Sequence, residues 1–213
     1  MASINKNQHM PNGKMGNLVY YSIHGKLYAR KYVVPDMSNL TRSQLDRREK
    51  FRQANAFTLP IKAVLDYGFV NFRNGKRSPW NEAMSRVCKN AFPTNSSILS
   101  PSNTIVSDGT LTGMDNGRLS WKDDYSVLLE WDNNTGSGSA RAGDKVSLLL
   151  YHTDSYTPFF LLEGNPRSMC RQELVVANAA KFKGALHAYA FFTRQNPANK
   201  HYQVARSEYL GVV

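Results

Sequence analysis

The sequence predicts an α+β protein in which an N-terminal β-hairpin and helices precede an antiparallel fibronectin/Ig-like β-sandwich. Three observations lead to this fold class. Runs of β-branched and aromatic residues punctuated by glycine open the chain, helical periodicity follows, and short apolar strands separated by turn-rich segments fill the rest. With 213 residues, of which 41% are hydrophobic and 20% charged, the chain can bury a substantial core.

The opening segment predicts the β-hairpin. Residues 18–22 and 26–34 are rich in strand-forming side chains, and residues 23–25 between them, Ile-His-Gly, offer a turn. Alternation along the second run places Lys26, Tyr28, Arg30 and Tyr32 on one side, and Leu27, Ala29 and Lys31 on the other. We therefore expect one face of the hairpin to be basic and aromatic.

A first helix is predicted to follow Pro35. Thr41 and Gln44 have the spacing of a capping box, and Pro60 marks the end of the periodic segment. The apolar residues that recur near helical intervals are Leu45, Phe51, Ala54 and Phe57.

Two further helical segments are expected before residue 93. Residues 61–72 form a helix, or a helix followed by a short extended piece. Ser78 is the expected N-cap of the third helix, with Pro79 at its first position, where the missing N–H is harmless. This helix is expected to end near Asn90.

Residues 93–101, which are rich in Ser, Asn and Pro, are expected to be a linker. They separate a basic hairpin-and-helix region, residues 1–92, from a β-sandwich domain, residues 102–213. Turn-rich stretches such as residues 132–138 separate short apolar runs beyond the linker, as in a β-sandwich. The predicted strands are 103–107, 125–131, 145–151, 158–162, 171–176, 186–193 and 204–210.

Three of these strands carry the predicted core. Alternate side chains on a sandwich strand face the opposite sheet, so one apolar set on each strand is expected to be buried. The expected inward residues are Val127, Leu129, Trp131, Val146, Leu148, Leu150, Leu186, Ala188 and Ala190.

The net charge of +11 is concentrated in the first half of the chain. Residues 1–92 contain 16 Lys and Arg against 5 Asp and Glu, whereas residues 93–213 contain 11 of each kind. This asymmetry favours a segment that meets an anionic partner, such as a nucleic acid, a lipid surface or an acidic protein face. The alternative is a solvated surface that keeps the protein soluble.

The candidate nucleic-acid or partner-binding residues are Lys14, Lys26, Tyr28, Arg30, Lys31, Arg42, Arg47, Arg48, Lys50 and Arg52. Their cations would engage phosphates, while tyrosines of the hairpin would stack on exposed bases. Alternatively, the tyrosines pack the hairpin against the helices and the cations are solvated. No helix-turn-helix, zinc-finger or RNA-recognition pattern is found, so any binding is expected to depend on the phosphate backbone.

Clustered catalytic groups and metal-ligand spacings are not found. The five histidines are dispersed, and the isolated Cys88 and Cys170 are expected to be free thiols in a reducing compartment. The densest acidic group is Asp123, Asp124, Glu130 and Asp132. Its members flank or lie within one strand and are interpreted as solvated turn and surface residues. We therefore expect no catalytic residues, metal or cofactor, and a protein that is not an enzyme.

Several motifs follow a recognisable pattern: Gly13-Lys14-x-Gly16, Gly25-Lys26-x-Tyr28-x-Arg30, Asn39-x-Thr41-x-x-Gln44, Arg48-x-Lys50-Phe51 and Arg206-Ser207-x-Tyr209-x-Gly211. They resemble an uncharacterised, domain-of-unknown-function family of small basic Bacteroidota proteins with a C-terminal fibronectin/Ig-like sandwich. The resemblance covers nearly the whole chain. It implies a bacterial origin and this architecture, but no activity and no catalytic residues.

Two functions follow from these observations. The first is a non-enzymatic interaction or assembly protein that docks through its basic half onto a protein partner or onto another copy of itself. Such a protein would be a structural component of a larger particle, phage-related or cellular. The alternative is a sequence-nonspecific nucleic-acid-binding protein; an unrecognised enzyme ranks last.

No apolar run approaches the roughly 20 residues of a membrane-spanning helix, and no secretory signal is found. We expect no membrane insertion and a location in the bacterial cytoplasm or in a phage-like particle.

Overall fold

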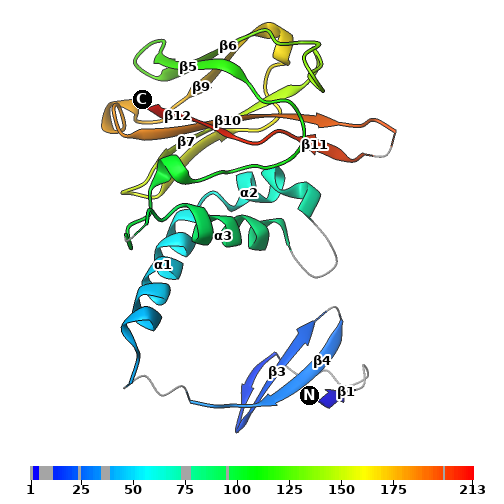
Figure 1. Cartoon of the computed structure of the whole chain (residues 1–213), viewed down its shortest axis with the longest axis vertical. Helices are drawn as coiled ribbons and strands as arrows, with labels where there is room; N and C mark the ends of the chain where they lie inside the picture. Colours follow the sequence, from blue (N-terminus) through cyan, green and yellow to red (C-terminus); the bar gives the residue numbers. More distant parts are fainter. Residues whose placement is uncertain are drawn as a thin grey trace. The chain divides into compact units, whose positions relative to one another are not determined.

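The computed structural model describes residues 2–4, 12–23, 25–34, 39–72, 78–94, 96–198 and 200–213. The chain forms two compact units, residues 1–42 and 43–213 (Figure 1). The division falls at the start of the first helix and not at residues 93–101, where the composition changes. The reason is that the helices share a hydrophobic core with the β-sandwich.

The first unit contains a four-stranded antiparallel sheet in the order β1-β4-β3-β2. Its strands are β1 (Ala2–Ile4), β2 (Gly13–Met15), β3 (Leu18–Ile23) and β4 (Lys26–Lys31). The predicted hairpin is confirmed by β3 and β4, which pair from Leu18 opposite Lys31 to Ile23 opposite Lys26. β1 and β2 were not predicted, since three residues are too few for alternation to be recognised.

The helical segment confirms the three predicted helices. They are α1 (Arg42–Thr58), α2 (Lys62–Gly68) followed by the 3₁₀ turn η1 (Val70–Phe72), and α3 (Pro79–Asn90). Ser78 caps α3 as expected, because its side-chain oxygen accepts a hydrogen bond from the backbone N–H of Asn81 at 3.2 Å.

The end of α2 lies directly against the segment that leads into the sandwich. A Cβ atom at Gly68 would come within 2.3 Å of the Val106 carbonyl oxygen, so only glycine permits this approach. The backbone N–H of Asp108 donates to the Gly68 carbonyl at 3.2 Å. Helix and sandwich are therefore joined by backbone contact.

The second unit contains the predicted antiparallel β-sandwich (Figure 1). One sheet has the order β5-β6-β9, with β5 (Asp115–Trp121), β6 (Ser126–Asp132) and β9 (Arg171–Val175). The other has the order β11-β10-β7-β8, and β12 also pairs with β10. Its strands are β7 (Lys145–His152), β8 (Thr157–Leu161), β10 (Leu186–Gln195), β11 (Tyr202–Val204) and β12 (Glu208–Val212).

The strand predicted at 103–107 is wrong. The 3₁₀ turn η2 (Pro101–Asn103) occupies its start, and the backbone N–H groups of Val106 and Ser107 donate to the side-chain oxygen of Ser207 at 2.9 and 3.3 Å. A hydroxyl thus takes the place of a neighbouring strand. The sandwich begins instead with β5, whose Asp, Asn, Gly and Ser residues are typical of turns and hid it from the strand prediction.

The strand predicted at 204–210 is interrupted. β11 ends at Val204 and β12 begins at Glu208, with residues 205–207 between them. There the hydroxyl of Ser107 donates to the Ala205 carbonyl at 2.8 Å, and the N–H of Ser207 donates to the Ser107 carbonyl at 3.1 Å. The final strand is therefore split because its middle bonds to the chain segment before β5.

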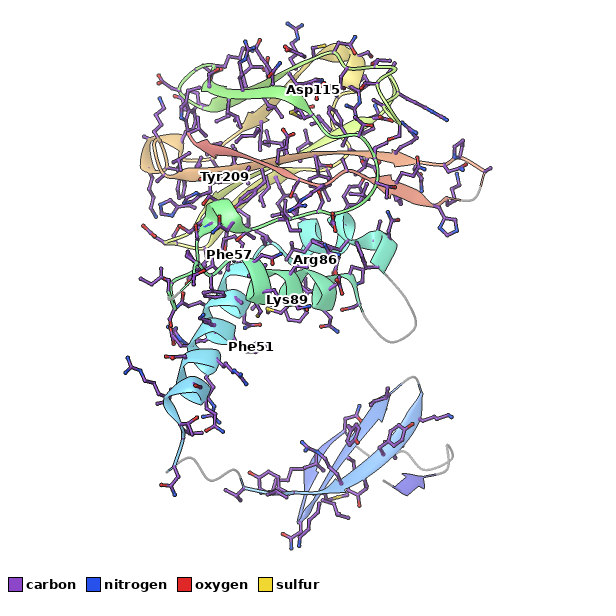
Figure 2. The ribbon with its side chains drawn as sticks, in the orientation of Figure 1. Phe51, Phe57, Arg86, Lys89, Asp115 and Tyr209 are labelled. Carbon is purple, nitrogen blue, oxygen red and sulfur yellow. The ribbon has the colours of Figure 1, made fainter. Side chains whose placement is uncertain are left out.

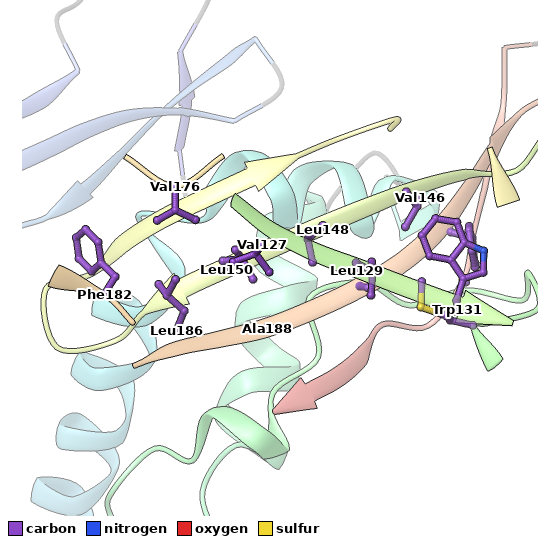
Figure 3. Packing of buried hydrophobic residues seen from close by; sticks show 14 of the residues in the cluster. Val127, Leu129, Trp131, Val146, Leu148, Leu150, Val176, Phe182, Leu186 and Ala188 are labelled. Carbon is purple, nitrogen blue, oxygen red and sulfur yellow. The ribbon is translucent and has the colours of Figure 1, made fainter. Parts of the chain in front are cut away.

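The core between the two sheets is the predicted one (Figure 3). All the residues expected to face inward are buried in a single cluster, which Met114, Val176 and Phe182 extend. Trp131 packs edge-on against Phe192, with ring centroids 5.6 Å apart. Alternation was a sufficient guide here because each strand presents one face to the opposite sheet.

A second hydrophobic core covers the other face of β7 and β10. This second core was not predicted from the sequence. Tyr151 and Phe191 are buried there with Phe57 of α1 and Leu65 of α2. The Tyr151 hydroxyl donates to the Phe57 carbonyl at 3.0 Å, and the two rings meet edge to face at 5.0 Å. The helices thus form a third layer, which explains why β7 and β10 are apolar on both sides.

A buried ion pair joins the loops at one end of the sandwich. Arg167 and Asp144 have fully buried side chains, and their Nε and Oδ2 atoms lie 3.2 Å apart. Arg194 donates from Nε to Asp144 Oδ1 at 2.6 Å, so one carboxylate serves two guanidinium groups. We call Asp144, Arg167 and Arg194 the arginine–aspartate cluster.

Three of the four remaining N–H donors of Arg167 are also used. They bond to the carbonyls of Thr112 and Gly113, each at 2.8 Å, and to the side chain of Asn134 at 2.5 Å. The guanidinium lies 3.7 Å from the centroid of the Phe192 ring, and the Trp131 indole N–H donates to the Arg167 carbonyl at 2.8 Å. Burial lowers the Arg167 pKa, an effect that Asp144 opposes.

Replacing Leu148 with alanine should lower the free energy of unfolding by about 2–5 kcal/mol, because it removes a buried side chain from the core between the sheets. Urea unfolding measures this loss. Leu45→Ala, at an exposed position of α1, is the matched control and should change the stability by less than about 0.5 kcal/mol. An unchanged midpoint for Leu148→Ala would contradict the assigned core.

Replacing Asp144 with asparagine should destabilise the fold by about 3–5 kcal/mol, because it leaves the buried Arg167 without a countercharge. Asp124→Asn is the control, since Asp124 forms only an exposed ion pair with Lys183. That change should cost less than about 1 kcal/mol. Equal effects of the two substitutions on urea unfolding would show that the cluster does not stabilise the sandwich.

Candidate interaction surface

The sheet of the first unit has two chemically different faces. Paired residues on neighbouring antiparallel strands share a face, and Tyr21 lies opposite Tyr28, Val19 opposite Arg30, and Lys14 opposite Val19. The basic face therefore carries Lys14, Tyr21, Lys26, Tyr28 and Arg30, together with the apolar Val19 and Ile23. This confirms the alternation expected from the sequence.

Aromatic rings and cations are in contact on the basic face. The Tyr21 and Tyr28 rings are stacked, with centroids 5.7 Å apart and planes inclined by 20°. The Lys14 ammonium lies 3.8 Å from the centroid of the Tyr32 ring, which adds a cation–π contact. Lys14, Lys26 and Arg30 are exposed, so their charges are available to a partner.

The opposite face of this sheet is largely apolar. The register places Met15, Leu18, Tyr20, Leu27 and Ala29 on it, as well as Lys31. Met15 and Leu18 are 49% and 40% exposed. Where side chains are described in the first unit, in residues 12–23, 25–34 and 39–42, no residue is buried. Among these described residues, the sheet therefore shows no buried core.

The candidate cations of the helix form a separate group. Arg42, Arg47 and Arg48 are exposed on α1, while Lys50 is partly buried with its ammonium 5.5 Å from the centroid of the Phe92 ring. Arg52 pairs with Glu49 at 2.6 Å. The positive charge of Arg52 is therefore balanced locally by Glu49, unlike the free cation expected from the sequence.

Only the last turns of α1 are buried. Phe57 near its C-terminal end is 3% exposed, whereas Phe51 is 57% exposed, and Figure 2 shows both on this helix. Leu45 is also exposed. Two of the apolar residues that suggested the helix therefore contribute nothing to the core.

The candidate cations are divided between the two compact units. Arg47, Arg48, Lys50 and Arg52 belong to the second unit, and the hairpin cations belong to the first.

The acidic residues Asp123, Glu130 and Asp132 lie in turns or on the surface, as the sequence predicts. Asp123 accepts backbone N–H bonds from Tyr125 and Ser126 at 2.8 and 2.7 Å, and these bonds lower its pKa. Asp132 accepts from the Asn116 amide at 2.6 Å, and Glu130 is exposed. Within the described part of the chain, no three His, Cys, Asp or Glu side chains are grouped to hold a metal ion.

None of the histidines that the structure describes belongs to a group of three His, Cys, Asp or Glu side chains that could hold a metal ion. His152 Nδ1 lies 2.7 Å from the Ser155 hydroxyl in a turn, and His187 Nδ1 lies 2.8 Å from the Tyr209 hydroxyl. Burial lowers the pKa of His187, while nearby Asp154 opposes this. His24 lies outside the described residues.

Arg141 and Arg194, to which no sequence motif assigns a role, line a cavity at the end of the sandwich. They are far apart in the chain and form no recognisable motif. The pairing of β10 with β7 sets Thr193 opposite Lys145, and so brings the turn before β7, with Arg141, close to Arg194.

The Glu49–Arg52 pair predicts a measurable titration. Hydrogen bonds from Arg52 and Gln53 lower the Glu49 pKa from 4.5 to about 2. A lowered folded-state pKa stabilises α1 at neutral pH, and this contribution is lost as the pH falls through the interval between those two values. Carboxyl-detected NMR should show the pKa rising toward 4.5 in Arg52→Gln. An unchanged Glu49 pKa would rule out this ion pair.

A family model matches residues 9–211, almost the whole chain. Its description is "Family of unknown function (DUF6266)". No curated protein and no solved structure matches the chain. Within the described residues, no helix has the length and apolar character needed to cross a membrane. The resemblance to an uncharacterised family is thereby confirmed: the chain belongs to DUF6266, a family of unknown function.

Proposed function

We propose that this is a non-enzymatic interaction protein that docks onto an acidic protein surface through the basic face of its N-terminal sheet, as a component of a larger particle, phage-related or cellular. The observation that carries the proposal is the charge of this face. Residues 1–35 contain no Asp or Glu, while Lys14, Lys26 and Arg30 are exposed on one side of the sheet.

The lack of buried side chains among the described residues of this unit supports docking as its task. A small sheet gains stability when an apolar face is covered, yet no side chain described in residues 12–42 is buried. Long cationic side chains without acidic neighbours in the sequence repel one another, and an acidic partner would remove this repulsion. Covering the sheet would thus improve both its packing and its electrostatics.

A nucleic acid is the second candidate partner, favoured by the tyrosine pair. Tyr21 and Tyr28 present nearly parallel rings beside cations, and a base can extend such a stack while the cations contact its phosphates. Recognition would then be largely independent of sequence, because every base has a stacking face.

We place the protein in the bacterial cytoplasm, in keeping with the Bacteroidota resemblance. Cys88 and Cys170 are both free thiols, which suits a reducing compartment. Incorporation into a particle would give the basic face its partner there.

The basic face should be required for assembly. In its native host, the variant with Lys14→Gln, Lys26→Gln and Arg30→Gln should be lost from the particle fraction in sedimentation, because three exposed cations are removed. The control is Arg118→Gln, Arg171→Gln and Arg206→Gln, which removes three exposed cations from the second unit. Equal retention of both variants in the particle fraction would refute docking through this face.

Binding to mixed-sequence single-stranded DNA tests the second candidate. The triple variant of the basic face should reduce the salt slope by about two units, since each cation contributes roughly 0.7. Tyr28→Ala should weaken binding by about 1–3 kcal/mol and leave the slope unchanged. The helix variant with Arg42, Arg47, Arg48 and Arg52 changed to Gln should reduce the slope by up to about three units if α1 also contacts phosphates. Absence of binding at low salt would eliminate the nucleic-acid candidate.

A further inference from the structure

A cavity of about 470 Å³ lies where β10 and β11 meet at the end of the sandwich. Its volume is within the usual range for small-molecule sites. The polar residues that line it are Arg141, Arg194, Gln195, Asn196, His201 and Gln203. Of the chain that the structure describes, no Asp or Glu lines this cavity. Its side chains are therefore mainly hydrogen-bond donors, as an anionic ligand requires.

Arg141 offers a complete guanidinium group to the cavity. Its backbone N–H donates to Asp144 Oδ2 at 2.9 Å, which fixes the position of the main chain. Its side chain is exposed, and the guanidinium makes no hydrogen bond or ion pair with any residue that the structure describes. All five N–H donors of this group are thus available to a ligand.

Arg194, in β10, is held in place by three hydrogen bonds. It donates from Nε to Asp144 at 2.6 Å and from Nη2 to the Ser139 carbonyl at 2.6 Å. Nη1 donates to the Gln203 side-chain oxygen at 3.2 Å, so the Gln203 amide keeps its NH₂ group free to donate. These bonds fix the guanidinium before a ligand arrives, which limits the ordering required on binding.

The arginine–aspartate cluster and the nearby Arg141 together carry more positive than negative charge. Asp144 is the single carboxylate between Arg167 and Arg194, and its side chain is fully buried. This group of three side chains therefore carries one net positive charge, and Arg141 adds a second. Two positive charges match the charge of a phosphate monoester, and a guanidinium group matches its geometry.

We propose that this cavity binds a small phosphorylated molecule, with its phosphate between Arg141 and Arg194. The cavity is larger than a phosphate ion, and its amide side chains and His201 provide hydrogen bonds for the rest of the ligand. The site lies within the second compact unit and does not depend on the basic face.

Isothermal titration calorimetry with adenosine monophosphate and with inorganic phosphate tests the proposal on the full chain. We expect saturable one-to-one binding, tighter for adenosine monophosphate than for phosphate. Arg141→Gln should weaken binding at least about tenfold, the effect of losing charged hydrogen bonds. Arg141→Lys should retain part of the affinity, because it keeps the charge but not the planar fork.

Two controls separate this site from other cationic surfaces. Arg171→Gln removes an equally exposed arginine outside the cavity, and the triple variant of the basic face removes cations from the first unit. Both should bind adenosine monophosphate as the unmodified protein does. An unchanged melting temperature shows that Arg141→Gln is folded.

The proposal is overturned if neither compound shows saturable binding, or if Arg141→Gln binds as tightly as the unmodified protein. Equal affinities for phosphate and adenosine monophosphate would overturn the assignment of a ligand larger than phosphate. Loss of binding in the basic-face variant alone would assign the interaction to the N-terminal sheet.

Discussion

The second unit depends on the balance between one buried carboxylate and two guanidinium groups. A buried charge is tolerated when it is paired and hydrogen-bonded, and Arg167 is paired with Asp144 and bonds to loop carbonyls. The loop before β5, the turn before β7 and the segment before β9 must therefore keep one relative arrangement. The same Asp144 carboxylate also accepts from Arg194, so the position of this cavity-lining residue is tied to the ion pair that stabilises the sandwich.

The two units differ in how far they bury apolar side chains. The sandwich with its helices buries apolar side chains in two cores, on either side of the sheet that contains β7 and β10. The N-terminal sheet has no buried residue among those whose side chains are described. The described residues of this sheet keep apolar and cationic surface exposed, which suits the proposed docking role.

Local patterns predicted most of the secondary structure but not the third layer. Alternation identified the inward residues of β6, β7 and β10, and the Ser78 cap was recognised because it depends on neighbouring residues alone. The strand at 103–107 was mispredicted because its N–H groups bond to the hydroxyl of Ser207, about a hundred residues later. The sequence shows no sign of such a bond.

The candidate surface was predictable to a similar extent. Alternation in β4 correctly placed Tyr28 and Arg30 on one face, since neighbours on a strand decide which side they share. It did not reveal that Arg52 is paired with Glu49, nor that Arg141 and Arg194 line one cavity. Both depend on side-chain geometry or on strand pairing between distant segments.

The sheet that contains β7 and β10 is buried on both sides, so the sequences of these strands are expected to change together with those of the helices that cover them. Tyr151, Tyr189 and Phe191 face the helical layer, whereas their strand neighbours face the other sheet. A relative that lost α1 and α2 would expose these rings, and it would have to replace them with polar residues to remain soluble. Aromatic residues at these three positions of a related sequence should therefore signal that a helical segment precedes its sandwich.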